Sequence, residues 1–448
     1  MIIPNFDKRR KAGPISRQKS VIKLLPLFAG ESAILRPQIF RQKGTDAMRR
    51  LFILGLCFLF LTACASAPPA AEEPPPPEPE IQEPEPPPAP VQEPYEIKDP
   101  TQEQEGYVPW TGIVEHLFFH PVIAYPELAF DGDNQANGLD DFMVTVDEYN
   151  KILQSVYDKG YVLVDINSVW SEEEGEDGPH MVRNTLYLPE GKKPLVLSYD
   201  DTNYYPYMLE NGFAHKLIIG EDLKIASYGL DPEGNEVVSR DLDAIPILDK
   251  FVEEHPDFSP FGAKGCLSLT GYEGILGYRT QTDTKEWDDA KEANRQKERE
   301  AVQPIVEELR RTGWTFGSHT WGHIRLGDGN MTRIQADTQR WLDEVGSLVG
   351  ETAILFYPHG ERPDGNDWTL TGPAFRYLQS QGFRVFCSVG VESFSFIKKD
   401  ISAVICDRLH PDGTTLRHSR DRYLQFYDAK DIIDLEVRPQ REVSWEEE

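Results

Sequence analysis

Cysteine is scarce in this sequence, with five in 448 residues and no CxxC pair. Cys57 and Cys64 lie in an apolar stretch near the N-terminus, whereas Cys266, Cys387 and Cys406 each lie inside an apolar run of the body. The pattern excludes a disulfide framework. We expect the three body cysteines to be small buried residues, and we expect Cys387 and Cys406 to stay unpaired even if adjacent strands hold them.

Basic residues are also in short supply, because 46 Lys and Arg stand against 75 Asp and Glu. The formal net charge is -29 and the pI is about 4.8, which argues against a nucleic-acid partner. An acidic body suits a solvated, extracytoplasmic protein, although it identifies no substrate. The length allows one large domain or two ordinary ones, with extra segments attached.

A targeting signal lies at residues 48–69, "MRRLFILGLCFLFLTACASAPP". Two arginines precede an apolar core that is short for a membrane span, and small residues follow it. The four letters "LTAC" resemble the lipobox of bacterial lipoproteins, which implies a signal peptide over 48–64 and lipidation of Cys64. The protein would then be held on the outer face of a bacterial membrane, in the cell envelope. An uncleaved anchor and a plain signal peptide are the alternatives.

Two further segments flank this signal. Residues 1–47 are basic and lack periodicity, and a signal peptide needs its charged end at the true N-terminus, so we interpret 1–47 as an over-extended reading frame. Residues 65–105 are rich in Pro and Glu and predict an extended spacer without a packed core. A globular domain is expected over 106–440.

Strands and helices alternate through this domain. Strands are predicted within 112–124, 161–170, 193–201, 262–271, 314–323, 352–360, 384–391 and 402–410. Helices are predicted within 145–160, 242–256, 288–313, 334–350 and 373–383, and a hairpin within 217–240. The alternation predicts parallel βαβ units, and their number indicates an α/β fold that closes, or nearly closes, into a barrel.

Polar residues gather where these predicted strands end, which is where barrel enzymes place their chemistry. They are Asp200, Asp201, His319, His323 and the run Tyr357-Pro358-His359.

Two histidines four residues apart, His319 and His323, follow one strand in "GSHTWGH". Two imidazoles and one carboxylate form a three-ligand set for a divalent transition metal, which leaves positions open for water and substrate. Asp200 and Asp201 would divide the roles of base and ligand between them. Each motif alone also occurs as an ordinary turn or cap, and the missing Glu separates "HTWGH" from the HExxH helix of zinc proteases.

At these residues the sequence resembles polysaccharide deacetylases, carbohydrate esterase family four. "SYDD" is similar to their T-[FY]-D-D motif and "SHTWGH" to their H-[ST]-x-x-H motif, and the resemblance covers roughly 112–435. It implies a distorted (β/α) barrel that removes acetyl groups from polysaccharides. By motif, Asp200 would be the general base, and Asp201, His319 and His323 would bind a divalent metal, zinc first, with Co, Ni or Mn as alternatives.

The segment before "SYDD" is similar to the poly-N-acetylglucosamine deacetylase branch. His120 in "LFFHPV" matches a histidine of that branch, which implies a general acid or a group that positions the acetyl. The alternative is a hydrogen-bonded core histidine. We expect a monomer acting on an acetylated polysaccharide, with the membrane reached through Cys64 and no nucleic-acid partner.

The sequence departs from the family at two motifs. Phe356 stands where many members carry the arginine that partners the base, and the late Leu-x-His motif has no clean match, with His410 and His418 as weak candidates for the acid. A binding protein without turnover is therefore one alternative, and an O-acetyl esterase on the same scaffold is another. Substrate contacts are expected from Trp321 and from the run Tyr357-Pro358-His359, although ordinary aromatic packing also explains the tryptophan.

Overall fold

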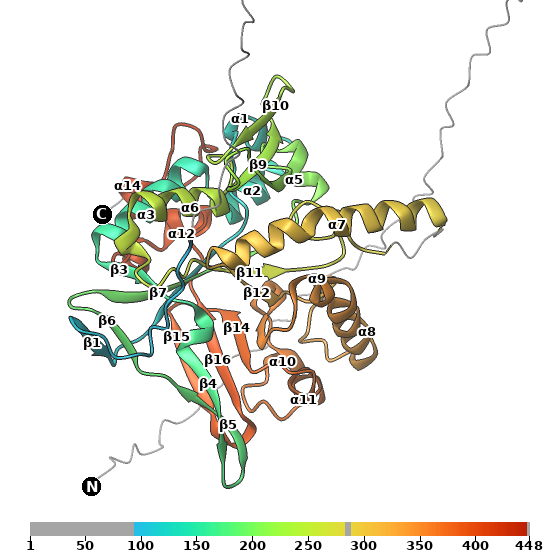
Figure 1. The fold of residues 1–448 in the computed structure, drawn as a ribbon. Helices are drawn as coiled ribbons and strands as arrows, with labels where there is room; N and C mark the ends of the chain where they lie inside the picture. Colours follow the sequence, from blue (N-terminus) through green and yellow to red (C-terminus); the bar gives the residue numbers. More distant parts are fainter. Residues whose placement is uncertain (1–93, 283–287, 446–448) are drawn as a thin grey trace, which may run out of the picture. The chain divides into compact units, whose positions relative to one another are not determined.

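The computed structural model describes residues 94–282 and 288–445 (Figure 1). The signal, Cys64 and most of the Pro/Glu-rich spacer lie outside these residues. Within the described ranges, no helix combines the length and the apolar character that crossing a membrane requires.

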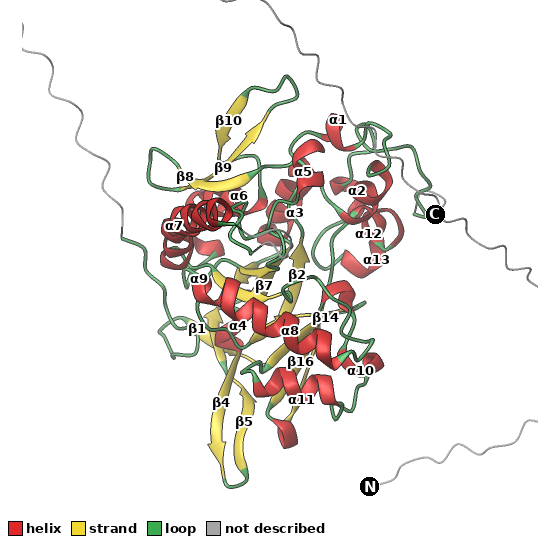
Figure 2. Cartoon of the chain, turned by 90° about the vertical axis from the view of Figure 1, so that its right-hand side faces the viewer, coloured by secondary structure: helices red, strands yellow, loops and turns green. Residues whose placement is uncertain are grey.

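Seven parallel strands form the centre of the body, with helices around them (Figure 2). In order of neighbours they are β2 (Glu115–Phe119), β7 (Lys193–Asp200), β11 (Cys266–Leu269), β12 (Thr315–Ser318), β13 (Ile354–Phe356), β14 (Val385–Val389) and β16 (Ala403–Arg408).

The two ends of this row meet just beyond β16. Leu409 pairs in parallel with Leu117 of β2, and its backbone N–H donates to the His116 carbonyl at 3.0 Å. In return, the Phe118 N–H donates to the Leu409 carbonyl at 2.9 Å. The fold is therefore a distorted (β/α) barrel, as the alternation predicted, and one short bridge closes it.

Other strands attach to this ring or form separate hairpins. They are β1 (Tyr107–Trp110), β3 (Tyr161–Leu163), β4 (Trp170–Gly175), β5 (Gly178–Arg183), β6 (Leu186–Pro189), β8 (Lys216–Ile219), β9 (Ile225–Leu230), β10 (Glu236–Ser239) and β15 (Phe394–Lys398). Of these, β3 pairs in parallel with β7, and β15 pairs antiparallel with β16.

The longer helices are α3 (Val146–Asp158), α6 (Ala244–Glu254), α7 (Asp289–Arg311), α8 (Met331–Trp341) and α11 (Pro373–Ser380). Shorter ones are α1 (Pro126–Ala129), α2 (Ala136–Phe142), α4 (Ile166–Val169), α5 (Pro206–Glu210), α9 (Ser347–Val349), α10 (Pro363–Asn366), α12 (Gly413–His418), α13 (Arg420–Tyr423) and α14 (Ala429–Ile432).

Local sequence explains where these helices begin and end. Thr145 caps α3 in a capping box, in which its hydroxyl accepts the Glu148 N–H and the Glu148 carboxylate accepts the Thr145 N–H. Gly160 follows α3 with a φ of 79°, a conformation that favours glycine. Apolar faces of α3, α6 and α7 pack on one side of the barrel, and those of α8 and α11 on another.

Two hairpins differ from the sequence expectation. The predicted hairpin within 217–240 is a three-stranded sheet, because β8 joins β9 and β10. The hairpin β4–β5 was not predicted, because "SEEEGEDG" lacks the alternating apolar residues that indicate a strand. It projects from the end of the body opposite β10 (Figures 1 and 2).

The packed body extends beyond the expected 106–440. Upstream, the Tyr95 hydroxyl donates to the Gly262 carbonyl at 3.0 Å and the Lys98 N–H donates to the Phe261 carbonyl at 2.8 Å. Downstream, the Trp445 indole donates to the Leu416 carbonyl at 2.8 Å. The sequence did not predict the upstream contacts, because the segment is rich in Pro and Glu and Tyr95 supplies its one aromatic ring. We call residues 94–100 the strap.

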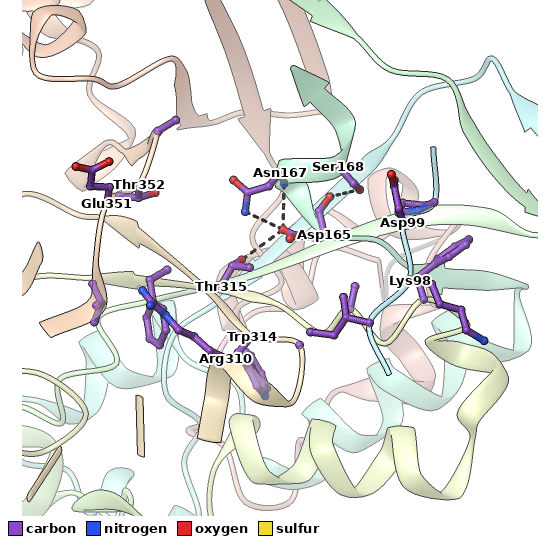
Figure 3. A pocket seen from close by; sticks show the side chains of 18 residues that line it. Lys98, Asp99, Asp165, Asn167, Ser168, Arg310, Trp314, Thr315, Glu351 and Thr352 are labelled. Atoms are coloured by element: carbon purple, nitrogen blue, oxygen red, sulfur yellow. Dashed lines mark hydrogen bonds between the residues drawn. The ribbon is translucent and has the colours of Figure 1, made fainter. Parts of the chain in front are cut away.

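A cavity of about 690 Å3 lies beside the strap at the N-terminal ends of the strands (Figure 3). Asp165 lies at its wall, where its carboxylate accepts the Asn167 N–H at 3.0 Å and the Thr315 hydroxyl at 3.4 Å. These bonds cap α4 and tie it to β12, which is a structural role. In barrels of this kind the chemistry lies at the opposite, C-terminal end of the strands.

Candidate metal and catalytic site

A second cavity, of about 360 Å3, opens at the C-terminal ends of the barrel strands. Six strand ends contribute to its lining: β2, β7, β12, β13, β14 and β16. The lining includes His120, Asp200, Asp201, His319, His323, Tyr357, His359, Val389 and His410.

Asp201, His319 and His323 converge in this cavity. One ligand atom from each lies within 4.8 Å of the other two, and the His323 Nε2 lies 3.8 Å from Asp201 Oδ2. Two nitrogens and one carboxylate oxygen at this spacing fit a divalent transition metal with positions left for other ligands. The donor set therefore fits the metal that the sequence motifs imply.

Neighbouring groups orient these donors. The His319 Nδ1 lies 3.0 Å from the Phe356 carbonyl, so it is the protonated nitrogen and Nε2 keeps its lone pair. Burial lowers the pKa of His323 to about 4, although the Asp201 carboxylate opposes the shift. The Tyr205 hydroxyl donates to Asp201 Oδ1 at 2.6 Å. The His323 imidazole is thus available as a neutral ligand near pH 7, and the His319 Nε2 is the nitrogen left to bind a metal.

The backbone is strained at several positions around the ligands. Asp201, Thr320, His323 and His359 all have φ between 47° and 60°, in the left-handed region that non-glycine residues seldom adopt. Such strain persists only where surrounding contacts enforce it, and it gathers at functional sites. One enforcing contact is the Asp337 carboxylate, which accepts the Trp321 N–H at 2.7 Å, inside the turn between the two histidines.

Asp200 is held by an arginine from the far end of the chain. Arg408 is fully buried and donates to both carboxylate oxygens of Asp200, at 2.8 and 2.9 Å. Burial alone raises the pKa of the Asp200 carboxyl, but the charge of Arg408 outweighs this effect and holds the pKa well below its usual range. The expected arginine position, Phe356, stacks instead against the Arg408 guanidinium at 4.5 Å. The partner of Asp200 is therefore present, but it comes from β16.

Two histidines and a carboxylate form a chain on the other side of the cavity. The His120 Nδ1 lies 3.0 Å from the His410 Nε2, and the His410 Nδ1 lies 2.9 Å from Asp412 Oδ2. Burial lowers the pKa of His120 to about 4, with the His410 charge as a further cause. Burial raises the pKa of Asp412, yet the His410 charge holds it below its usual range. His418 takes no part, since its Nδ1 lies 3.4 Å from the Ser444 hydroxyl, outside the cavity lining.

The proposed substrate contacts separate into two groups. Tyr357 and His359 line the cavity, and the His359 ring lies 4.4 Å from the His323 ring. Pro358 and Trp321 do not belong to the lining. The Trp321 indole donates to Glu344 at 2.8 Å, and the Arg340 guanidinium covers its ring at 3.5 Å. Trp321 therefore packs against Glu344 and Arg340 and does not line the cavity. This arrangement agrees with the alternative of ordinary aromatic packing.

Sequence reasoning missed Arg408 as the partner of Asp200, it missed Asp412, and it missed Tyr205 as the hydrogen-bond partner of Asp201. One signal was available for the first two, because "DRLHPD" follows a predicted strand with several polar groups in a row. The three cysteines are free and buried, even though Cys387 and Cys406 stand opposite each other in β14 and β16.

Comparison with known proteins gives a partial match. The polysaccharide deacetylase family model matches residues 284–370, which contain His319, His323 and His359 but neither Asp200 nor Asp201. Among curated protein sequences, none matches this chain. The similarity to the polysaccharide deacetylase family model is therefore confined to one segment of the chain.

Several solved deacetylases have a similar trace. The deacetylase PplD of Streptococcus pyogenes is 11% identical over 73% of this chain and 99% of its own, with a TM-score of 0.35. A polysaccharide deacetylase from Bacillus cereus is 12% identical over 70% and 69%, with a TM-score of 0.38. IcaB from Ammonifex degensii is 13% identical over 68% and 94%, with a TM-score of 0.36. Likeness at this level does not say what this chain acts on.

Proposed function

We propose that this chain is a metal-dependent hydrolase that removes N-acetyl groups from a polysaccharide containing N-acetylglucosamine, either in the cell envelope or exported from the cell. The observation that carries the proposal is the joint placement of a three-donor metal set and an arginine-held carboxylate in one cavity. The matched deacetylase segment supports the same reaction class.

The metal would be held by Asp201, His319 and His323, with zinc as the first expectation and Co, Ni or Mn as alternatives. Such an ion lowers the pKa of water toward 7 and polarises an acyl carbonyl. Asp200 accepts the proton of the attacking water, and Arg408 keeps that carboxylate ionised and aimed. The Asp200 Oδ2 lies 3.9 Å from the His319 Nε2, which puts the base next to the ligand set.

The leaving nitrogen needs a proton when the C–N bond breaks. His410 uses both ring nitrogens, one toward Asp412 and one toward His120, so Nε2 of His120 remains for the substrate. For His120 to offer a proton on Nε2, Asp412 has to be ionised and His410 has to donate from both nitrogens, to Asp412 and to the His120 Nδ1. His120 gives that proton to the amine and takes one from His410 on Nδ1.

A binding protein without turnover was considered because the family's arginine and its late histidine had no clean match in the sequence. The roles above account for both. Arg408 supplies the partner of the base, and His410 with Asp412 supports the acid. An O-acetyl esterase remains the second candidate, because the same groups can hydrolyse an ester, and substrate profiling separates the two.

The localisation proposal rests on the signal at 48–64. Lipidation of Cys64 would place the body on the outer face of a bacterial membrane, where acetylated polysaccharide is found. Mass spectrometry of the mature N-terminal peptide tests it, since a diacylglyceryl Cys64 is the expected product and an unmodified Cys64 would contradict it.

The activity test uses the purified full chain. Metal content is measured by elemental analysis, and acetate release is measured on N-acetylglucosamine oligomers with and without a chelator. We expect about one metal per chain and acetate release that the chelator abolishes and added zinc restores. Metal without acetate release from N-acetyl or O-acetyl glycans would contradict the hydrolase, whereas absence of metal in both wild type and His323→Ala would contradict the ligand set.

A further inference from the structure

The catalytic cavity is small for a polymer substrate. At about 360 Å3 it has room for one or two sugar rings, so the neighbouring rings of a chain must lie outside it. Resting on the proposed function, we propose that Trp368 and Phe394 form a binding surface for the sugar rings that continue beyond the cavity.

Exposed apolar side chains gather on this flank of the barrel. The exposed fractions are 57% for Trp368, 39% for Phe394, 49% for Phe396 and 64% for Val391. The Trp368 and Phe394 rings lie 6.4 Å apart at 67°. Large aromatic side chains are seldom left in water as a group unless they meet a ligand or a partner.

This surface is continuous with the cavity. Val389 lines the cavity at the end of β14 and is 39% exposed. Gly390 follows it and donates its N–H to the Arg408 carbonyl at 2.9 Å. Asp407, the residue before Arg408 on β16, stands opposite Phe394 of β15. A polymer that leaves the cavity over Val389 therefore meets the two aromatic rings next.

Trp368 is held in place rather than loosely exposed. The Arg362 guanidinium lies 3.8 Å from the centre of its ring, and Arg362, which is only 7% exposed, bonds the Asp407 carboxylate. A ring fixed in this way loses little conformational entropy when a ligand stacks on it. The apolar C–H face of a pyranose is the ligand that a flat, half-exposed indole suits.

A second copy of the chain is the other occupant to consider, because β15 is the outermost strand of its sheet. Hairpin strand β5 lies beside β15, and Glu172 of the same hairpin binds Arg384 and Ser402 of the body. This hairpin crowds the strand that a partner chain would have to approach. The observations therefore favour a glycan.

Binding is measured apart from turnover, so that the two proposals can fail separately. Titration calorimetry gives the Kd of an N-acetylglucosamine hexamer and of the dimer for wild type, Trp368→Leu and Phe394→Ser. Ile113→Ser is the matched control, since this residue is 58% exposed and precedes β2, at the other end of the strands. We expect Trp368→Leu and Phe394→Ser to weaken hexamer binding by about five- to tenfold, with dimer binding and the control within twofold of wild type.

The result judges the surface whether or not acetate is released. A hexamer Kd that stays unchanged in both variants would overturn the proposal, and so would wild type that binds no hexamer. A dimer of the protein that Phe394→Ser dissociates, without an effect on the hexamer, would reassign the face to self-association. If hexamer binding depends on Trp368 but no acetate appears, the surface stands and the deacetylase fails.

Discussion

Two buried clusters in this protein use the same chemistry, an arginine that donates to carboxylates, in different ways. In the first, Arg408 binds both oxygens of Asp200 at the wall of the catalytic cavity. In the second, Arg438 of the C-terminal segment binds Glu148 at 2.6 and 2.7 Å and Asp140 at 2.8 Å. Both arginines are almost completely buried.

The clusters differ in the number of cations that bind each aspartate. In the C-terminal cluster, Asp140 binds three arginines, because Arg417 at 3.0 Å and Arg441 at 2.9 Å join Arg438. In the cavity, Asp200 has a single cation and faces the ligand histidines. A saturated ion cluster tethers segments of the chain, whereas a carboxylate with one cation stays ionised and can still accept a proton.

The largest expected effect is on catalysis, from Asp200→Asn. The amide cannot accept the proton of water, so we expect kcat for acetate release to fall by about 10²–10⁴-fold. Metal content stays at the wild-type level, because the side chain at position 200 lies beside the ligands and is not one of them. Retention of even a tenth of the wild-type rate would contradict the role of Asp200.

The C-terminal cluster is expected to respond in stability instead. Arg438→Met leaves the buried Glu148 carboxylate without the arginine that binds both its oxygens and removes one of the three arginines at Asp140. This change costs about 3–5 kcal/mol in the free energy of unfolding. Urea unfolding measures this loss, and kcat of the folded enzyme is the control that we expect to stay unchanged. An unaltered unfolding curve would show that the cluster does not tether the chain.

Asp243 is a third kind of buried carboxylate, one that no arginine of the described chain binds. Among the described residues Asp243 has no ion pair, and burial raises its pKa to about 6. The folded protein therefore keeps this proton to a higher pH than the unfolded chain, whose aspartates titrate near pH 3.9. Its unfolding free energy falls by up to about 3 kcal/mol as the pH rises from about 4 to 6.

Asp243→Asn removes this penalty and keeps a side chain that caps α6. We expect the variant to gain stability over wild type as the pH rises through that range, which urea unfolding at pH 4, 5, 6 and 7 can follow. A difference that does not vary with pH would mean that Asp243 titrates normally.

The smallest effect is expected from Arg408→Lys. An ammonium keeps the positive charge but cannot bind both oxygens of Asp200, so the base is less well aimed. We expect kcat to fall about tenfold, with Arg438→Lys as the matched control that leaves kcat unchanged. Equal kcat values for Arg408→Lys and wild type would mean that charge alone, and not two-point binding, serves the base.

The sequence was informative wherever neighbouring residues determine the outcome. Alternating strands and helices predicted the barrel, and the capping signals around Thr145 and Gly160 predicted α3. The groups at strand ends predicted the cluster of Asp201, His319 and His323, because parallel strands end at one edge.

The remaining features depend on contacts that are distant in the chain. Arg408 lies 208 residues from Asp200 and reaches it because the barrel closes between β16 and β2. Trp321 stands beside the ligands in sequence, yet its ring packs against Glu344 and Arg340, outside the cavity lining. No local pattern contains this information.

The strap determines where the described chain enters the body. It docks at the N-terminal ends of the strands, through Tyr95 and Lys98, while the cavity opens at their C-terminal ends. The described chain therefore enters the body at the floor of the barrel, on the side away from its mouth. A tether fused directly ahead of residue 94 is thus expected to leave the cavity open to a polymer too large to diffuse around an immobilised molecule.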